Sequence, residues 1–173
     1  MLKSNVNLNH NTILVTGAAG FIGSNLVKRL YADMQGIAVI GLDNMNDYYD
    51  VHLKEYRLAQ LVQYPNFVFV KGNIADKQLI EEVFTEYKPQ VVVNLAAQAG
   101  VRYSIIAPDA YIESNLIGFF NILEACRNHP WSIWYMPQVH LCMALIRKSR
   151  IPQMIKWITL CRFMRRPKRA TSC

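Results

Sequence analysis

The sequence predicts an α/β fold, an incomplete doubly wound parallel sheet with helices on both faces in three α/β/α layers. Short apolar segments rich in β-branched residues alternate with segments of helical periodicity from residue 12 to about residue 128. The first apolar segment leads directly into a turn with three glycines. Strands that are apolar on both faces and joined by helices form parallel sheets. The chain has 173 residues, 52% of them hydrophobic, which is enough to bury such a core.

The first strand is predicted at residues 12–16, and it enters Gly17-Ala18-Ala19-Gly20-Phe21-Ile22-Gly23 before a helix to about Asp33. Three glycines at this spacing allow a tight turn, let the backbone approach a pyrophosphate, and let the helix pack closely on the strand. The amino terminus of the helix then offers free N–H groups and a positive dipole end to phosphates. The segment is therefore a candidate dinucleotide site.

A second strand at residues 37–42 ends in Asp43, twenty residues after Gly23. A carboxylate at this place takes both hydroxyls of an adenosine ribose. It would repel a 2′-phosphate, for which an Arg is the usual partner. Asp43 therefore favours NAD over NADP as the cofactor.

The alternation continues with a helix, a strand, a helix, a strand and a long helix, predicted at residues 51–62, 67–70, 77–87, 91–95 and 110–128. Pro108 and Asp109 supply a start for the long helix. With right-handed crossovers the four strands lie in the order 3-2-1-4. Their carboxyl ends meet at one edge of the sheet, where a dinucleotide would lie.

The composition changes at about Pro130. Residues 1–130 carry ten Lys and Arg and twelve Asp and Glu, whereas residues 131–173 carry nine Lys and Arg, no acidic residue, no Gly and all three Trp. We therefore expect two parts: residues 1–130 as the amino-terminal part of a nucleotide-binding domain, and residues 131–173 as a basic, poorly ordered tail. Cys126, Cys142, Cys161 and Cys173 show no metal-ligand spacing, so we expect no metal site.

Four segments of residues 10–130 together resemble the extended short-chain dehydrogenase/reductase family of NAD-dependent epimerases and dehydratases, in its UDP-glucuronate 4-epimerase branch. They are residues 17–23, residues 41–49 (Gly-Leu-Asp-Asn-Met-Asn-Asp-Tyr-Tyr), residues 94–104 (Asn-Leu-Ala-Ala-Gln-Ala-Gly-Val-Arg-Tyr-Ser) and residues 114–118 (Ser-Asn-Leu-Ile-Gly). The resemblance implies a Rossmann fold, bound NAD, a UDP-sugar substrate and homodimers. The reaction it implies is inversion at C4 of a UDP-hexuronic acid through a 4-keto intermediate.

The resemblance also implies site residues. Those expected at the pyrophosphate are Gly17, Gly20, Phe21, Ile22 and Gly23, and those at the adenosine ribose are Asp43 and Asn44. Those expected at adenine are Asn73 and Ile74, and those under the nicotinamide half are Leu95, Ala96 and Ala97. Asn115 is expected near the cofactor from the long helix, and Gln98, Arg102 and Tyr103 are expected to face the sugar. Asn73 departs from the family, which usually has an Asp that accepts from the adenine amino group. An Asn can still accept through its carbonyl, so we expect weaker binding there.

The family's chemistry needs a Ser or Thr and a Tyr-x-x-x-Lys pair, whose Lys lowers the Tyr pKa for proton transfer. No Tyr of this chain has a Lys four residues later. We therefore expect no catalytic residue and no epimerase activity from this chain alone. A short reductase that uses another base is the competing enzyme hypothesis.

A change of reading frame accounts for the missing pair. With suitable codons and one base added before codon 131, residues 131–136 read Val-Glu-His-Leu-Val-Tyr and residues 137–144 read Ala-Ser-Ser-Ser-Ser-Val-Tyr-Gly. In the same frame, residues 163–168 read Tyr-Ala-Ala-Thr-Lys. These match the family's fifth strand, serine motif and Tyr-x-x-x-Lys. Our hypothesis is that a one-base deletion after codon 130 leaves residues 131–173 out of frame.

The alternative is that the tail is a basic, aromatic-bearing segment for nucleic acid or an anionic membrane surface. Pro137, Pro152 and Pro167 interrupt any long amphipathic helix there, so we expect no specific nucleic-acid or membrane partner. No signal peptide or membrane span is recognisable, and we expect a cytoplasmic protein. Without a fifth strand, residues 91–95 would form an exposed edge, and half of the dimer's helix pair would be lost. We therefore expect a product of marginal stability, with binding of the sugar and dimerisation both compromised.

Overall fold

The computed structural model describes residues 8–100, 102–129 and 133–135, all within a compact unit formed by residues 1–137. Residues 138–173 form a second unit that lies outside the described residues. The predictions that residues 131–173 are poorly ordered and translated out of frame therefore concern residues outside the described part, apart from residues 133–135.

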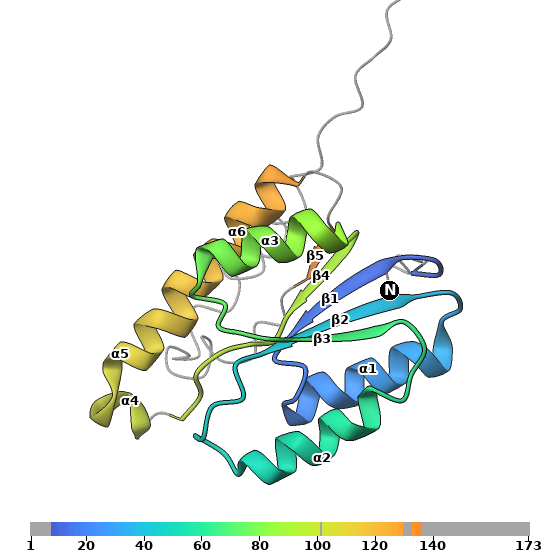
Figure 1. Ribbon diagram of the computed structural model, residues 1–173. Helices are drawn as coiled ribbons and strands as arrows, with labels where there is room; N and C mark the ends of the chain where they lie inside the picture. Colours follow the sequence, from blue (N-terminus) through green and yellow to red (C-terminus); the bar gives the residue numbers. More distant parts are fainter. Residues whose placement is uncertain (1–7, 101, 130–132, 136–173) are drawn as a thin grey trace, which may run out of the picture. The chain divides into compact units, whose positions relative to one another are not determined.

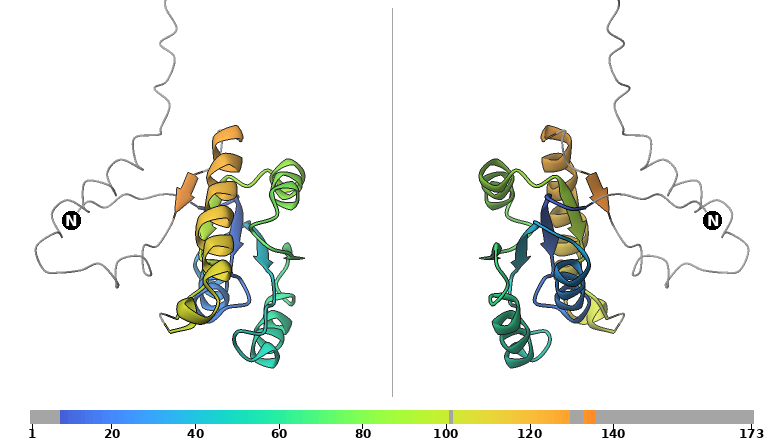
Figure 2. Two further views of the ribbon diagram at one scale, coloured as in Figure 1. Left: turned by 90° about the vertical axis from the view of Figure 1, so that its left-hand side faces the viewer. Right: turned by 90° about the vertical axis from the view of Figure 1, so that its right-hand side faces the viewer.

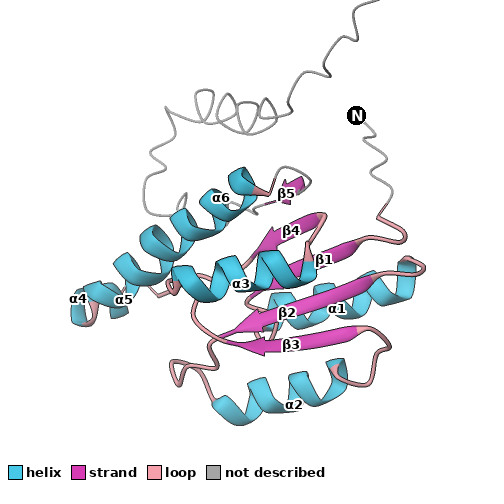
Figure 3. Cartoon of the chain, turned by 45° about the horizontal axis from the view of Figure 1, so that its top comes forward, coloured by secondary structure: helices cyan, strands magenta, loops and turns pink. Residues whose placement is uncertain are grey.

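A five-stranded parallel sheet forms the centre of the unit, in the order β3-β2-β1-β4-β5 (Figure 3). Its strands are β1 (Thr12–Thr16), β2 (Ala38–Asp43), β3 (Phe67–Lys71), β4 (Val91–Asn94) and β5 (Ile133–Tyr135). In register, Leu14 of β1 lies between Ile40 of β2 and Val92 of β4. The predicted order of the first four strands is confirmed.

The prediction that β4 forms an exposed sheet edge is wrong. Val91, Val92 and Val93 pair in parallel with Ile133, Trp134 and Tyr135 of β5. β-branched and aromatic residues fit a pleated surface, and the preceding helix supplies the crossover that a parallel partner needs. The residues present in this chain therefore form a fifth strand without any change of reading frame. The edge strand on this side of the sheet is the three-residue β5.

Helices cover both faces of the sheet (Figure 1). One face carries α1 (Phe21–Asp33) and α2 (Val51–Leu61), and the other carries α3 (Lys77–Tyr87) and α6 (Phe119–Asn128). Successive side chains of a strand point to opposite faces, so Leu14 packs with α3 and α6 whereas its neighbours Ile13 and Val15 pack with α1 and α2. The three-layer prediction is confirmed.

The long helix predicted at residues 110–128 is a continuous helical column of three pieces (Figure 2). It consists of α5 (Pro108–Tyr111), a π-helical stretch η1 (Ile112–Gly118) and α6, and a short α4 (Tyr103–Ile106) precedes it. Gly118, at the end of η1, lies against Ile74, since a Cβ at Gly118 would be 2.4 Å from Ile74 Cγ1. Helix periodicity alone does not distinguish a π-helical stretch, which often occurs at functional sites.

Cys126 lies on α6 and packs against the core. Burial raises the pKa of this thiol to about 12 from an ordinary 9.0, so only about one molecule in a thousand or fewer holds the thiolate at pH 8. We expect iodoacetamide to leave the Cys126 peptide unmodified at pH 8 in the folded chain and to label it after denaturation. The raised pKa contributes stability that is present below about pH 9 and is lost as the pH rises toward 12. Rapid labelling of Cys126 in the folded chain, measured by mass spectrometry of its peptide, would contradict the burial of this thiol.

In the described part of the chain, no helix combines the length and apolarity needed to cross a bilayer.

Candidate functional site

The glycine turn joins β1 to α1 at the carboxyl edge of the sheet. Gly17 has a φ of +70°, and its backbone N–H donates to the Leu42 carbonyl at 2.7 Å. A Cβ at Gly17 would lie 3.0 Å from the Ala96 nitrogen, so only glycine lets the turn approach the segment after β4 this closely. Gly20 precedes α1, and no side chain caps the helix. The first N–H groups of α1 therefore have no side-chain cap.

Gly23 packs the helix onto the turn. A Cβ there would lie 2.1 Å from the Gly17 carbonyl oxygen and 2.9 Å from Ala18 Cα. Phe21 and Ile22, in contrast, expose 71% and 56% of their surfaces, and the Arg57 guanidinium lies over the Phe21 ring at 5.9 Å. Their contribution to a phosphate site would come from their backbone N–H groups.

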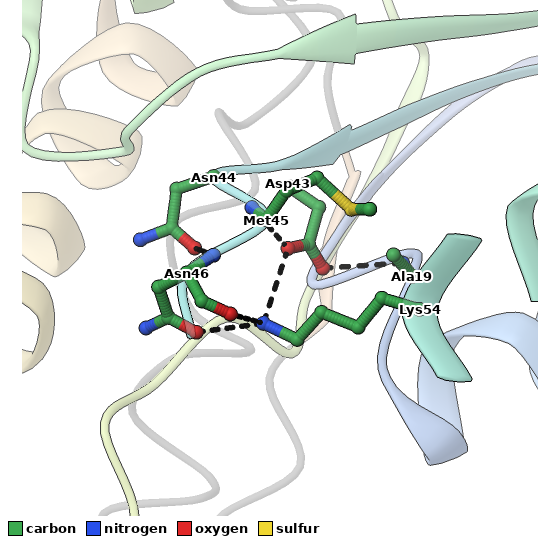
Figure 4. Close-up of polar contacts among 6 residues, drawn as sticks. All are labelled: Ala19, Asp43, Asn44, Met45, Asn46 and Lys54. Carbon is green, nitrogen blue, oxygen red and sulfur yellow. Dashed lines mark hydrogen bonds and ion pairs between the residues drawn. The ribbon is translucent and has the colours of Figure 1, made fainter. Parts of the chain in front are cut away.

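Asp43 ends β2 and is 7% exposed (Figure 4). Its Oδ2 accepts from the Ala19 backbone N–H at 3.1 Å, and its Oδ1 accepts from the Met45 N–H at 2.9 Å. The carboxylate is thus fixed to the glycine turn on one side and to its own loop on the other. A carboxylate oxygen accepts about two hydrogen bonds, so each oxygen retains capacity for a ligand hydroxyl.

Lys54 is a site residue that the sequence analysis missed. Its ammonium group is buried and donates to the Asn46 carbonyl at 2.9 Å and to Asn46 Oδ1 at 2.6 Å, while Asp43 Oδ1 lies 3.9 Å away (Figure 4). A buried ammonium needs such partners to offset desolvation. Lys54 shares a helical face with the buried Leu61, and that seven-residue spacing was the available signal.

Hydrogen bonds to Thr16 fix the segment that follows β4. The Leu95 and Ala96 N–H groups donate to Thr16 Oγ1 at 3.1 and 3.0 Å, and the Thr16 hydroxyl donates to Asn94 Oδ1. One buried hydroxyl therefore holds residues 94–96 against the end of β1, beside the glycine turn.

Asn115 of η1 holds the next part of the same loop. Its Oδ1 accepts from the Gln98 backbone N–H at 2.8 Å, and its Nδ2 donates to the Gln98 carbonyl at 3.0 Å. Gln98 itself is only 6% exposed. The predicted role of Asn115 at the cofactor is thus accompanied by a structural one, since its side chain fixes the loop by a pair of hydrogen bonds.

Replacing Asn115 by Ala removes both hydrogen bonds and leaves two backbone groups of Gln98 without these partners. We expect a loss of about 2 kcal/mol in the free energy of unfolding, since each lost bond to a partly buried backbone group costs about 1 kcal/mol. Chemical denaturation measures this. Gln78→Ala removes an exposed side-chain amide that donates to Glu82 on the surface of α3, and it serves as the control. An equal, small loss in both variants would contradict the assigned role.

Four tyrosines gather where the loops after β2 and β4 meet. The Tyr48 ring lies 4.6 Å from that of Tyr49 and 4.7 Å from that of Tyr103, and the Tyr111 hydroxyl donates to the Ala99 carbonyl at 2.7 Å. Desolvation, followed by interactions with neighbouring tyrosines, raises the pKa of Tyr48 and of Tyr111. Both hydroxyls therefore remain protonated at neutral pH, and neither is suited to act as a base there.

Asn73 follows β3 and faces η1. Its Oδ1 accepts from the Ala75 N–H at 3.0 Å and its Nδ2 donates to Glu113 Oε1 at 2.7 Å. The adjacent Ile74 is 4% exposed and packs against Gly118. The Asn73 carbonyl oxygen thus accepts one hydrogen bond from the backbone and keeps a second acceptor position, so its expected role at adenine stays a prediction.

One pocket contains most of the predicted residues. Those that line it are Gly17, Gly20, Asp43, Asn44, Asn73, Ile74, Leu95, Ala96, Ala97 and Gln98. The pocket is also lined by Asn46, Tyr48, Tyr49, Lys54 and Ser114, which the sequence analysis did not select. Six predicted residues do not line the pocket: Phe21, Ile22, Gly23, Arg102, Tyr103 and Asn115. The Tyr103 ring nevertheless packs against the ring of Tyr48, which does line it.

The parallel sheet, the glycine turn at a helix amino terminus and the acidic residue after β2 define a Rossmann-type nucleotide-binding domain. Comparison with known proteins specifies the family. A family model described as GDP-mannose 4,6 dehydratase matches residues 14–143, most of the chain. The chain therefore belongs to this family, within the extended short-chain dehydrogenases/reductases, as the sequence resemblance predicted.

Curated relatives agree with this assignment. The chain is 54% identical over 116 residues to protein CapI of Staphylococcus aureus, covering 67% of this chain and 34% of that protein. It is 45% identical over 126 residues to UDP-glucuronate 4-epimerase 4 of Arabidopsis thaliana, covering 71% of this chain and 28% of that protein. The chain thus spans about a third of the length of these relatives.

A solved structure of UDP-glucuronic acid 4-epimerase from Bacillus cereus, in complex with UDP-glucuronic acid and NAD, is also similar. It shows 32% identity and a TM-score of 0.60, covering 67% of this chain and 36% of that one. The NAD complex of Thermus thermophilus UDP-glucose 4-epimerase shows 35% identity and a TM-score of 0.58, covering 71% of this chain and 36% of that one.

Proposed function

We propose that this chain binds NAD in the pocket between the glycine turn, Asp43 and the loop after β4. The observation that carries the proposal is the buried Asp43 carboxylate, which is fixed by the Ala19 and Met45 N–H groups and keeps one acceptor position on each oxygen. A pair of parallel acceptors suits the 2′- and 3′-hydroxyls of a ribose. The NAD-containing structures of the similar epimerases support the proposal.

The residues present fit a dinucleotide at each end of the pocket. The pyrophosphate would lie at the start of α1, which no side chain caps. Gly17 and Gly20 carry no Cβ that would reduce the space there for the phosphates. The nicotinamide half would lie over residues 95–97, of which Leu95 and Ala96 are held beside the turn by Thr16. When bound, NAD supplies a hydride acceptor for oxidation at a sugar carbon and a hydride donor for the return step.

The loop at residues 98–103 is the part of this chain that we assign to a UDP-sugar. Gln98 lines the pocket, the Arg102 side chain is exposed, and Tyr103 packs on Tyr48 at the rim. We propose that Gln98, Arg102 and Tyr103 face the sugar of a UDP-hexuronic acid. We propose that a full-length enzyme containing residues 1–130 would epimerise the sugar at C4. This chain does not complete that reaction, because its sequence offers no Tyr-x-x-x-Lys pair.

The test combines binding and turnover. The purified chain with saturating NAD is incubated with UDP-glucuronic acid, and the anomeric protons are followed by NMR for conversion to UDP-galacturonic acid. We expect NAD binding without conversion. Conversion above a no-protein control would overturn the inactivity proposal and favour a base elsewhere in the chain, whereas the absence of NAD binding would overturn the proposed function itself.

We also propose that residues 131–173 are translated out of frame. The support lies in the sequence: one added base yields a serine motif and a Tyr-x-x-x-Lys motif in one constant frame. Sequencing the coding DNA across codons 125–180 decides the matter. A continuous frame that contains both motifs is the expected result, and a frame interrupted by stop codons would overturn the proposal.

A further inference from the structure

Three donors converge on the Gly100 carbonyl, where the loop after β4 turns into α4. The Tyr103 and Ser104 backbone N–H groups donate to this oxygen at 3.0 and 3.3 Å, and the Tyr111 hydroxyl donates to it as well. Gly100 has a φ of +101°, a conformation that favours glycine. The position of this one carbonyl therefore decides where α4 begins, and with it where Tyr103 lies.

Tyr48 contacts the same turn from the loop after β2. A Cβ at Gly100 would lie 2.1 Å from the Tyr48 hydroxyl oxygen and 3.3 Å from Tyr48 Cζ, so the end of this ring occupies the space beside the Gly100 Cα. The Tyr48 ring also packs on the Tyr103 ring, with 4.7 Å between the ring centres. One side chain thus contacts both Gly100 and Tyr103, the two residues that set the start of α4.

Tyr48 also lines the pocket to which we assign NAD. Two hydrogen bonds fix the loop that carries it: the Met45 N–H donates to Asp43 Oδ1 at 2.9 Å, and the Lys54 ammonium donates to the Asn46 carbonyl at 2.9 Å. A ligand that fills the pocket contacts Tyr48 and removes space into which the ring could otherwise move. Such a loss of freedom can be passed on to whatever packs against the ring.

Resting on the proposed NAD binding, we propose that Tyr48 is a positioning residue for the loop that we assign to the UDP-sugar. NAD in the pocket restricts the Tyr48 ring, and the ring in turn fixes Gly100 and Tyr103. Arg102 is the N-cap residue of α4, so the same contacts place its backbone. The cofactor thereby orders the sugar-binding groups before the sugar arrives, which lowers the entropic cost of binding the second ligand.

The experiment measures amide hydrogen exchange of the full chain, without NAD and with NAD at a concentration that calorimetry shows to saturate each variant. The readout is the exchange of Tyr103, Ser104 and Ala107, whose N–H groups donate to the Gly100 and Tyr103 carbonyls. We expect NAD to slow this exchange by about fivefold or more, the lower end of ordinary coupling between two sites. In Tyr48→Ala the slowing should fall below about 1.5-fold, because the link is removed.

Two further variants separate positioning from a general loss of packing. Tyr48→Phe keeps the ring on Tyr103 and should retain slowing by NAD of about threefold. Tyr56→Ala removes an exposed ring of α2 outside the pocket lining and should leave the slowing unchanged. A ring with a merely structural role would, when removed, speed exchange equally with and without NAD, so the slowing would persist.

The outcomes distinguish this inference from the proposed function. If NAD binds but slowing is absent from the unmodified chain, or persists in full in Tyr48→Ala, the positioning role is overturned while the proposed function stands. If the unmodified chain does not bind NAD, both are overturned.

A double-mutant cycle tests the Gly100 contact itself and needs no large truncation, so it decides the matter even if Tyr48→Ala does not fold. Gly100→Ala places a Cβ against the Tyr48 hydroxyl and should speed the exchange of Tyr103 and Ser104. In the Tyr48→Phe background that oxygen is absent, so the same substitution should have an effect smaller by about half or more. Equal effects in the two backgrounds would show that Tyr48 does not contact Gly100 in solution and would overturn the inference.

Discussion

Replacing Asp43 by Asn is expected to weaken NAD binding about 100-fold. The carboxylate offers charged acceptors to two ribose hydroxyls, and a hydrogen bond to a charged group contributes about 1.5–3 kcal/mol, where about 1.4 kcal/mol is tenfold in affinity. The amide retains one oxygen, which the backbone N–H groups of Ala19 and Met45 also require. Calorimetric titration of the variant with NAD measures the loss.

The same substitution is expected to reverse the cofactor preference. With the carboxylate neutralised, the Lys54 ammonium becomes the dominant charge beside the ribose, and a 2′-phosphate is then attracted rather than repelled. NADP binding should therefore stay constant or tighten. Asp47→Asn neutralises an exposed carboxylate in the same loop and serves as the control. Equal losses of NAD affinity in the two variants would contradict the assignment of Asp43 to the ribose.

Replacing Gly23 by Ala is expected to lower the melting temperature by about 10 °C or more. The added Cβ would lie 2.1 Å from the Gly17 carbonyl oxygen and within 2.9 Å of Ala18 Cα, both backbone atoms that rotamer changes do not move. Relief requires α1 to shift from the turn, and overpacking of this kind costs about 3 kcal/mol. For a domain of this size that cost corresponds to about 10 °C.

Gly72→Ala provides the matched comparison. A Cβ at Gly72 would lie 2.0 Å from Leu79 Cδ2, a similar overlap, but with the far end of a flexible side chain. Leu79 has other rotamers available, so the loss should be smaller by half or more. Differential scanning fluorimetry of both variants measures the difference. A Gly23→Ala variant that melts within about 2 °C of the unmodified chain would show that α1 does not rest on the turn in solution.

The local parts of the fold were predictable from the sequence, because they depend on neighbouring residues. The β1 strand, the glycine turn and α1 follow one another along the chain, and their periodicity and glycine spacing suffice to identify them. The same holds for Asp43, which ends a short apolar strand. The first four strands were ordered correctly because right-handed crossovers in a doubly wound sheet with a glycine turn after the first strand give the order 3-2-1-4.

The parts that were missed depend on contacts between distant segments. The Asn73–Glu113 contact joins residues forty positions apart, and Lys54 enters the site because α2 turns it toward Asn46. Tyr48 meets Tyr103 only once the loops after β2 and β4 converge. The β5 strand was missed for another reason. Ile133–Tyr135 lies within the segment whose basic composition predicted a tail, although its β-branched and aromatic residues favour a strand.

The most direct test of the account is an NMR titration of the full, isotopically labelled chain with NAD, with backbone amides assigned. If NAD binds in this pocket, saturable shifts are expected at Gly17, Ala19 and Gly20 in the turn, at Met45 beside Asp43, and at Ala96 after β4, while the amides of α3 remain unchanged. Absence of shifts at millimolar NAD would contradict the central claim. Shifts confined to residues outside the pocket would contradict it equally, because they would place the dinucleotide elsewhere on the molecule.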